Sequence, residues 1–211
     1  MSYFDRSEIS ISDIKAFLKK VKGGNPEPEN LEAIFAMGSY SHEIIFEPSK
    51  VQPSDLIEPS DIVLAKSMKD RFFQDELCRM LVMRPDFQRE HAMFKEIEVG
   101  GMRYNARIKC DGISKGIKTI LEFKGLSVTT EKAFLEAINN LNYDMAAVQY
   151  LLVAECEMIL IVGISKIKPT LLFKKIIKRH DETYLWGEEK LIQGLKLWHE
   201  FSPEDIQMIA A

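Results

Sequence analysis

The segment MILIVGIS, at Met158 to Ser165, is an almost continuous run of apolar residues. A short run of this kind is typical of a strand buried on both faces of a sheet, because a strand with one wet face alternates apolar and polar residues. The next segment, PTLLFKKII at 169–177, predicts a neighbouring strand. A sheet covered on both faces requires flanking helices, so this run favours an α/β fold.

The rest of the chain supplies those helices. Ser12 and Asp13 are possible N-caps of the first helix, and Asp61 is the expected N-cap of a longer one. The inward side of that longer helix is predicted to carry Val63, Leu64, Met68, Phe72 and Leu77. The predicted helices cover 11–20, 31–46, 61–81, a segment capped by Thr129 or Thr130 that reaches Ile138, 143–153 and 182–200.

A β-hairpin is predicted near the middle of the chain. MFKEIEV at 93–99 and MRYNARIKC at 102–110 flank Gly100 and Gly101, which tolerate the positive φ of a tight turn. The second hairpin strand leads to Asp111, and KTILEFKG at 118–125 predicts a further strand. The order of elements therefore predicts an α/β fold with a mixed central β-sheet flanked by α-helices.

The length of 211 residues is enough for one buried core and short for two. We expect a single domain with a helical N-terminal part at 1–90, a sheet core at 91–180 and a C-terminal helix in 181–211. No internal repeat or low-complexity linker divides the chain.

Composition gives an expectation about the cellular compartment. Cys78, Cys110 and Cys156 form no CxxC pair, which argues against a disulfide framework and against zinc or iron–sulfur sites. The N-terminus has no apolar signal core, and no window reaches the roughly 18 apolar residues that cross a bilayer. We expect a cytoplasmic protein with no membrane partner.

The net charge of −4 does not by itself indicate a nucleic-acid binder, although basic patches can be local.

Two charges within the predicted strand 118–125 carry the first chemical signal. Side chains alternate along a strand, so Glu122 and Lys124 share one face, whereas Phe123 points to the other. If Asp111 ends the adjacent hairpin strand, its carboxylate lies beside that of Glu122. Two carboxylates and one ammonium form a cleft suited to Mg²⁺ or Mn²⁺, with the carbonyl of Phe123 as an additional ligand.

Such a cleft is suited to phosphodiester hydrolysis. A bound divalent ion neutralises charge on the phosphate and lowers the pKa of a bound water, and Lys124 would orient that water. The D/E-x-K pattern alone is weak, because about one match is expected by chance in such a chain. Asp13-Ile14-Lys15 is another match. On the motif alone, an active site and a solvated ion pair on an edge strand are equally good interpretations.

Four stretches in sequence order add context: ISISDIKAF, MGSYSHEIIFEPSKV, RIKCDGI followed by LEFKG, and FLEAINNLNYDMAAVQYLL. The first two resemble a Ser-x-Ser-x-Leu helix and a Gly-x-x-x-His-x-x-x-x-x-Pro signature. The third stands where an Arg-Pro-Asp and an Asp-x-Lys-Thr strand are expected, and the last resembles the helices that follow. Across about residues 9–165, the chain resembles the PD-(D/E)XK nuclease superfamily, in its exonuclease VIII branch of phage-type recombination exonucleases related to lambda exonuclease.

The resemblance implies a restriction-endonuclease-like core and assigns roles to residues. The implied metal ligands are His42, Asp111, Glu122 and the carbonyl of Phe123, the implied catalytic lysine is Lys124, and the implied substrate-binding aromatic residue is Tyr150. Without this context, His42 would be interpreted as a partly buried helix histidine and Tyr150 as a core aromatic residue with a satisfied hydroxyl.

The chain departs from the family pattern at three places. Ala146 stands where the Gln-x-x-x-Tyr helix motif has its glutamine, and it has no side-chain donor or acceptor. Gln149, three residues later on the same helical face, is a candidate substitute in substrate binding. Cys110 replaces the proline before the acidic ligand, and Gly125 replaces the threonine after the lysine.

The resemblance implies a metal-dependent deoxyribonuclease that degrades linear double-stranded DNA from 5′ to 3′ in phage-type recombination. It further implies a ring-like homo-oligomer and a single-strand annealing protein as partner. Ala146 motivates a second hypothesis, a DNA-binding or assembly protein that keeps the fold but has lost efficient turnover. A third is an endonuclease of the same superfamily. A nuclease of the CRISPR adaptation type is disfavoured because the four-cysteine cluster is missing.

The basic run KKIIKRH at 174–180, preceded by Lys166 and Lys168, is a candidate phosphate-contacting patch. A run of charges is more often a solvated face, and both interpretations stay open at this point.

Overall fold

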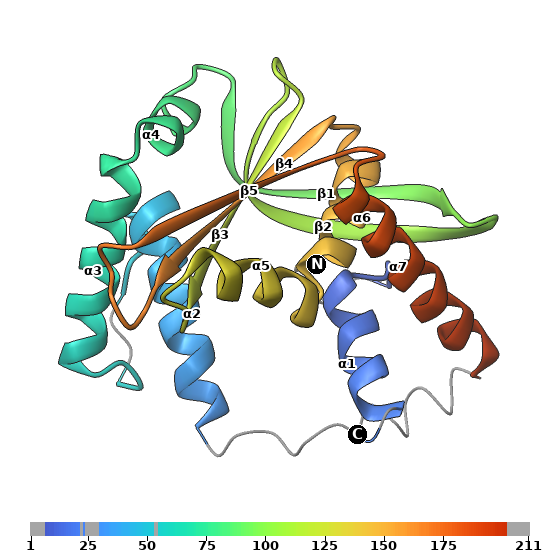
Figure 1. Ribbon diagram of the computed structural model, residues 1–211, viewed down its shortest axis with the longest axis horizontal. Coiled ribbons are helices and arrows are strands. Elements are labelled where there is room, and N and C mark those ends of the chain that lie inside the picture. The colour runs from blue at the N-terminus through green and yellow to red at the C-terminus, as the bar shows by residue number, and fades with distance from the viewer. Residues whose placement is uncertain (1–6, 22, 24–29, 53–54, 202–211) are drawn as a thin grey trace.

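The computed structural model describes residues 7–21, 23, 30–52 and 55–201 (Figure 1). Its helices are α1 (Ile11–Val21), α2 (Leu31–Phe46), α3 (Pro59–Gln74), α4 (Glu76–Val82), α5 (Glu131–Asn140), α6 (Tyr143–Ala154) and α7 (Glu182–Glu200). Its strands are β1 (Phe87–Val99), β2 (Met102–Ser114), β3 (Thr119–Leu126), β4 (Met158–Ser165) and β5 (Leu172–Lys178). The helices and strands follow one another in the predicted order, except that α3 and α4 stand in place of one predicted helix.

The strands form one five-stranded sheet in the order β1-β2-β3-β4-β5. β3 and β4 run parallel, and every other neighbouring pair is antiparallel. The parallel pair is connected through α5 and α6, as a crossover between parallel strands requires. The prediction of a mixed central sheet flanked by helices is confirmed.

Helices cover both faces of the sheet, with α2 and α3 on one side and α1, α5, α6 and α7 on the other (Figure 1). β4 contributes to both cores, because Leu160 and Val162 pack with the first group and Ile159 and Ile161 with the second. Residues 159–165 of β4 are all buried, which confirms the strand predicted from the apolar run.

The hairpin of β1 and β2 is longer than predicted. It turns at Gly100 and Gly101, whose φ angles of 57° and 78° confirm the expected positive values. Val99 pairs with Met102, and the pairing continues to Phe87 and Ser114 at the far end. The first strand thus begins six residues before the predicted Met93, because its polar first half lacks the apolar alternation that marks a strand.

The single helix predicted over 61–81 is wrong, because the chain breaks at Asp75. Asp75 adopts an extended backbone (φ −75°, ψ 123°), and its carboxylate accepts a hydrogen bond from the amide of Cys78 at the start of α4. Its other carboxylate oxygen lies 2.8 Å from the ammonium of Lys174 in β5. The break turns Leu77 outward, and Val63 is also exposed, contrary to expectation.

Three helices begin at a cap different from, or more specific than, the predicted one. The N-cap of α3 is Glu58, not the predicted Asp61, because Pro59 already occupies the first helical position. At α1 the cap is Ser10 rather than Ser12, since Ser10 and Asp13 exchange side-chain hydrogen bonds with each other's amides at 2.7 and 3.2 Å. At α5 the cap is Thr130, whose hydroxyl accepts from the amide of Ala133. Asp13 also binds the guanidinium of Arg107 in β2 at 3.0 Å, which fixes α1 to the sheet.

Two glycines allow α7 to approach its neighbours closely. A Cβ at Gly187 would lie 2.4 Å from the backbone oxygen of Asp144 in α6. A Cβ at Gly194 would lie 2.9 Å from a methyl group of Ile14 in α1. These contacts bring α1, α6 and α7 together on one side of the sheet.

All three cysteines are free and buried, as expected for a chain without a disulfide framework. Among the described residues, no helix is both long and apolar enough to cross a membrane.

Candidate active site

The centre of the site is a fork between β2 and β3. Their pairing covers only Gly112–Ser114 and Thr119–Leu121 and stops at Asp111 and Glu122. There, the carboxylate of Glu122 accepts a hydrogen bond from the amide of Asp111 at 3.1 Å. The carboxylate of Asp111 accepts one from the amide of Phe123 at 2.6 Å. Side-chain bonds thus replace backbone bonds where the strands separate.

His42 reaches this fork from α2. Its Nδ1 lies 2.9 Å from Oδ1 of Asp111, while its ring packs edge-on against Phe123 with centroids 5.3 Å apart. The neighbouring α2 residues Tyr40, Ile44 and Ile45 are buried in the core on this side of the sheet, so the position of the helix is fixed. The imidazole is therefore held by packing as well as by its carboxylate partner.

Lys124 completes the group on the opposite face of β3 from Phe123. Its ammonium lies 2.9 Å from Oε2 of Glu122 and 5.7 Å from the centroid of the Tyr143 ring at the start of α6. The structure thus brings His42, Asp111, Glu122 and Lys124 into one chain of contacts. Both carboxylates are buried, with 7% and 6% of their residue surfaces exposed.

Asp111 and His42 shift each other's proton affinity. Burial alone would raise the pKa of Asp111, but the charges of His42 and Lys124 and two hydrogen bonds outweigh it and hold that pKa below its ordinary value. Burial alone would lower the pKa of His42, but the charge and hydrogen bond of Asp111 hold it above its ordinary value. The pair therefore favours a carboxylate beside an imidazolium when no cation is present.

The pKa of Glu122 shifts in the opposite direction from that of Asp111. Burial, and then the charge of Asp111, raise the pKa of Glu122 to about 7, although Lys124 opposes the shift. For Lys124, burial would lower the pKa, but Glu122 and Asp111 raise it above its ordinary value. The ammonium stays charged at neutral pH, and the two carboxyl groups at the fork differ in how readily they ionise.

Glu90, which sequence reasoning missed, also lies at the fork. Ligand atoms of His42, Glu90 and Asp111 all lie within 4.8 Å of one another. Glu90 has a φ of 48°, rare for a residue with a side chain, and its carboxylate is bound by the ammonium of Lys109 at 2.6 Å. A cluster of two carboxylates and one imidazole thus lies on the α2 side of the sheet.

The hairpin register could have revealed Glu90. Counting back from the pair Val99 and Met102 through a regular antiparallel ladder places Glu90 directly opposite Asp111, since Arg89 pairs with Gly112 and His91 with Cys110. The predicted hairpin began at Met93, and so it ended three residues short of this position.

The two residues expected to bind substrate have different surroundings. Gln149 is fully buried and lies in the core, not in the cleft, with its amide nitrogen bonded to the carbonyls of Ile9 and Arg107 at 3.0 and 3.1 Å. Tyr150 is partly exposed, and its hydroxyl donates to the carbonyl of Lys109 at 3.3 Å. Ala146 is partly exposed four residues before Tyr150, so both lie on one side of α6.

The basic run at 174–180 lies away from the fork. It falls in and after β5, the edge strand, which is separated from β3 by β4. Lys174 is paired with Asp75, and the guanidinium of Arg179 donates to the carbonyls of Cys156 and Leu151 at 2.8 and 2.6 Å. These two residues therefore have structural roles.

The donors at the fork fit a hard divalent cation. Asp111 and Glu90 offer carboxylate oxygens and His42 an imidazole nitrogen, and their ligand atoms are close enough to share one ion. The carboxylate of Glu122 lies next to these three groups: one of its oxygens accepts a hydrogen bond from the amide of Asp111, and the other accepts one from the ammonium of Lys124. The amide of Phe123 is used by Asp111, and its carbonyl remains a predicted ligand.

Comparisons with known proteins give a match at the level of the fold. No family model matches the chain, and no curated protein matches it. A candidate exonuclease from Eubacterium rectale shares 18% identity at a TM-score of 0.61, over 92% of this chain and 82% of that chain. At this identity, the likeness shows the fold alone.

Two more distant structures also match. A phage-related exonuclease from Haemophilus somnus shares 12% identity at a TM-score of 0.44, over 92% of this chain and 97% of that chain. An alkaline exonuclease from Laribacter hongkongensis shares 11% identity at a TM-score of 0.42, over 96% of this chain and 91% of that chain.

Proposed function

We propose that this chain is a divalent-metal-dependent deoxyribonuclease that hydrolyses phosphodiester bonds of DNA. The observation that carries the proposal is the chain of contacts from His42 through Asp111 and Glu122 to Lys124 at a strand fork. Four buried or half-buried ionisable groups in contact are costly to fold, and such groups cluster at functional sites. The shared fold of the Eubacterium rectale candidate exonuclease supports the same reaction class.

The proposed ligands of Mg²⁺ or Mn²⁺ are His42, Asp111, Glu122 and the carbonyl of Phe123, with Glu90 added from the structure. When bound, such an ion neutralises charge on the phosphate and lowers the pKa of a coordinated water. The amide of Phe123 holds Asp111 in place, and the imidazole of His42 fixes its other oxygen. These contacts preorganise the ligands before an ion arrives.

Lys124 is the proposed catalytic lysine. Glu122 holds its ammonium at 2.9 Å, and its raised pKa keeps it charged throughout the neutral range. A charged ammonium beside the scissile phosphate stabilises the negative charge that develops on the phosphate oxygens, and it orients the attacking water. Arginine or glutamine at this position would not reproduce the compact charge at the same reach.

A pocket of about 540 Å³ gives access to the fork from the α2 side. His42 and Glu90 line it, together with Ile34 and Phe35, which are 43% and 65% exposed. An aromatic side chain at a pocket mouth can stack on a base regardless of its identity, as nucleases without sequence preference require. Tyr150, partly exposed on α6, is proposed to contact the substrate from the other side of the sheet.

The finer proposal is a 5′ to 3′ exonuclease acting on linear double-stranded DNA in phage-type recombination. Its support is the ordered series of motifs between about residues 9 and 165. The same resemblance supports a homo-oligomer and a single-strand annealing protein as partner. An endonuclease of the same superfamily is the alternative within this reaction class.

The test is incubation of linear, nicked and covalently closed duplexes with Mg²⁺, with Mn²⁺ and with EDTA. We expect degradation of the linear duplex only, dependent on the ion, with 5′ labels released before 3′ labels. Lys124→Met and Asp111→Asn should each reduce the rate by at least about 100-fold. Metal-dependent cutting of closed circles would indicate the endonuclease, and cleavage that survives both substitutions would overturn the proposed site.

Ala146 supports a second candidate, a DNA-binding protein with the nuclease fold and weak turnover. The side of α6 that carries Tyr150 has no hydrogen-bonding group at Ala146. The matched test is Ala146→Gln. If the missing amide limits turnover, this variant cleaves linear DNA several-fold faster than the natural chain, with unchanged thermal stability. Metal-dependent binding without cleavage by either protein would favour the second candidate.

A further inference from the structure

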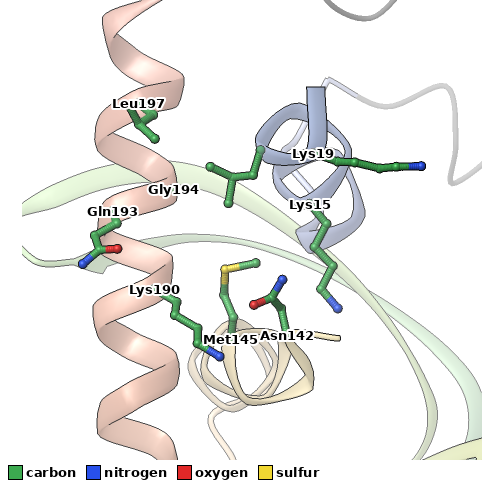
Figure 2. Close-up of a pocket in the computed structure, with 9 residues that line it drawn as sticks. Lys15, Lys19, Asn142, Met145, Lys190, Gln193, Gly194 and Leu197 are labelled. Carbon is green, nitrogen blue, oxygen red and sulfur yellow. The ribbon is translucent and has the colours of Figure 1, made fainter. Parts of the chain in front are cut away.

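A second pocket, of about 500 Å³, lies between α1, α6 and α7 (Figure 2). Lys15 reaches from α1 toward Asn142 at the start of α6, and Lys19 lies at the outer rim. Lys190 and Gln193 line the pocket from α7. Its shape depends on the close approach of α1 to Gly194, where a side chain would meet Ile14 and Leu18.

This pocket is basic in a chain whose net charge is −4. Three lysines line it, and none of the described residues that line it is acidic. The pocket on the α2 side has the opposite character, since Glu43, Glu47 and Glu90 line it with one lysine. Of these two pockets, the one formed by α1, α6 and α7 therefore favours an anionic ligand without a bound cation.

The lysines of this pocket differ in how far their ammonium groups are already bound to other groups of the protein. The ammonium of Lys190 is used by Asn139, through two oxygens at 2.9 and 2.6 Å, and by Asp144 at 2.7 Å. Lys15 donates to the carbonyl of Leu141 at 2.8 Å. This bond uses one of the three N–H donors of its ammonium. Lys15 thus supplies charge for a ligand, while Lys190 holds the start of α6 in place.

Tyr143 connects this pocket to the active site. The ammonium of Lys15 lies 5.1 Å from the centroid of the Tyr143 ring, and that of Lys124 lies 5.7 Å from the same centroid. Burial, and then the charge of Lys124, lower the pKa of Lys15 to about 8, so the two ammonium groups influence each other. A ligand in the pocket would therefore lie beside the group that faces the scissile phosphate.

We propose that the pocket formed by α1, α6 and α7 binds phosphodiester groups of the substrate strand adjacent to the one that is cleaved. This inference rests on the proposed nuclease function. Successive phosphates of one strand advance by about 3.4 Å along a duplex axis, so a strand whose scissile phosphate lies at Lys124 carries neighbouring phosphates past Tyr143. Lysine contacts to phosphates hold a strand without reading its sequence.

The test compares binding of a fluorescent single strand of about 12 nucleotides in Ca²⁺ and in EDTA over a range of salt concentrations. The variant Lys15→Gln should bind about fivefold or more weakly, with a salt dependence reduced by about one counterion. Gln193→Glu, which removes no lysine, should weaken binding in the same direction. Lys132→Gln, on the exposed surface of α5, is the matched loss of charge and should bind like the natural chain.

The outcomes separate this inference from the proposed function. If the natural chain cleaves DNA and the pocket variants bind and cleave equally well, the inference is overturned while the nuclease stands. If the natural chain never cleaves but its binding depends on the pocket, the nuclease proposal fails and the pocket stands. If the variants change only the oligomeric state in sedimentation, the pocket holds a second copy of the chain, and the inference is wrong. Circular dichroism confirms that each variant is folded.

Discussion

Asp111 and Glu122 each accept a hydrogen bond from the strand that carries the other, at 2.6 Å from the amide of Phe123 and at 3.1 Å from that of Asp111. This exchange fixes both carboxyl groups where β2 and β3 separate. It also keeps two negative charges close together in a buried place, and only one of them lies next to His42. The raised pKa of Glu122 is the physical consequence.

The first prediction concerns pH and the stability of the metal-free protein. A carboxyl whose folded-state pKa is about 7, raised from 4.5, binds its proton more tightly when folded. The free energy of unfolding therefore falls as pH rises from about 4.5 to 7, by on the order of 3 kcal/mol for this group. Glu122→Gln cannot ionise, so its stability relative to the natural chain should increase from pH 5 to pH 8.

Urea unfolding in EDTA at several pH values measures this difference. The titrations of His42 and Asp111 occur in both proteins, so they largely cancel when the two are subtracted. Parallel stability curves for the natural chain and Glu122→Gln would show that the pKa of Glu122 is not raised.

A second prediction concerns Glu90 and its partner Lys109. Glu90→Gln removes one carboxylate from the cluster with His42 and Asp111, and should weaken Mn²⁺ binding about tenfold or more. Lys109→Gln removes the ammonium that competes for Glu90 at 2.6 Å, and should strengthen it. Titration calorimetry with Mn²⁺ measures both, with Glu136→Gln on the exposed side of α5 as the matched loss of charge. Equal affinities for all four proteins would exclude Glu90 from the site.

How far the sequence predicts this fold depends on how local each signal is. β4 and α7 have unbroken patterns that end at turns, and their predicted bounds agree with the structure. The break at Asp75 has no comparable signal, because an aspartate inside a helical pattern either stays in the helix or caps a new one. In the structure, the extended conformation of Asp75 is accompanied by an ion pair with Lys174, which is distant in the sequence. A local pattern does not reveal such a contact.

The candidate site also contains some residues that local sequence patterns predict and others that depend on distant parts of the chain. Alternation along one strand is enough to place Glu122 and Lys124 on a common face, and a hairpin places Asp111 beside them. Glu90 needs the register counted through the whole hairpin. The basic pocket depends on three helices from both ends of the chain and on a glycine contact between two of them, so no local pattern predicts it.

The third prediction uses one substitution at two glycines. Gly187→Ala places a Cβ 2.4 Å from a backbone oxygen that cannot move without shifting α6, and should lower the free energy of unfolding by about 2 kcal/mol or more. Gly38→Ala in α2 meets nothing within 4 Å and should raise it by about 0.5 to 1 kcal/mol, because alanine restricts the unfolded chain. Thermal unfolding measures both, and equal shifts of the same sign would contradict the packing of α6 on α7.

The fourth prediction separates Gln149 from Tyr150. Gln149→Leu leaves two carbonyl groups and the hydroxyl of Tyr104 without their amide partner inside the core, which should cost about 2 kcal/mol or more of stability. Its KM for DNA should not change at a temperature where the variant is folded. Tyr150→Phe removes the hydrogen bond to the carbonyl of Lys109 at a partly exposed position, so its stability should fall by less than about 1 kcal/mol while its KM rises.

Denaturant unfolding and steady-state kinetics on linear duplex DNA decide between these effects. The contrast is informative because both residues lie on α6, one position apart, and their side chains go to different places. A raised KM for Gln149→Leu with unchanged stability would mean that the amide turns toward the substrate after all. In that case Gln149 would take over the role of the glutamine that Ala146 replaces, and the family pattern would be preserved with a shift of three residues.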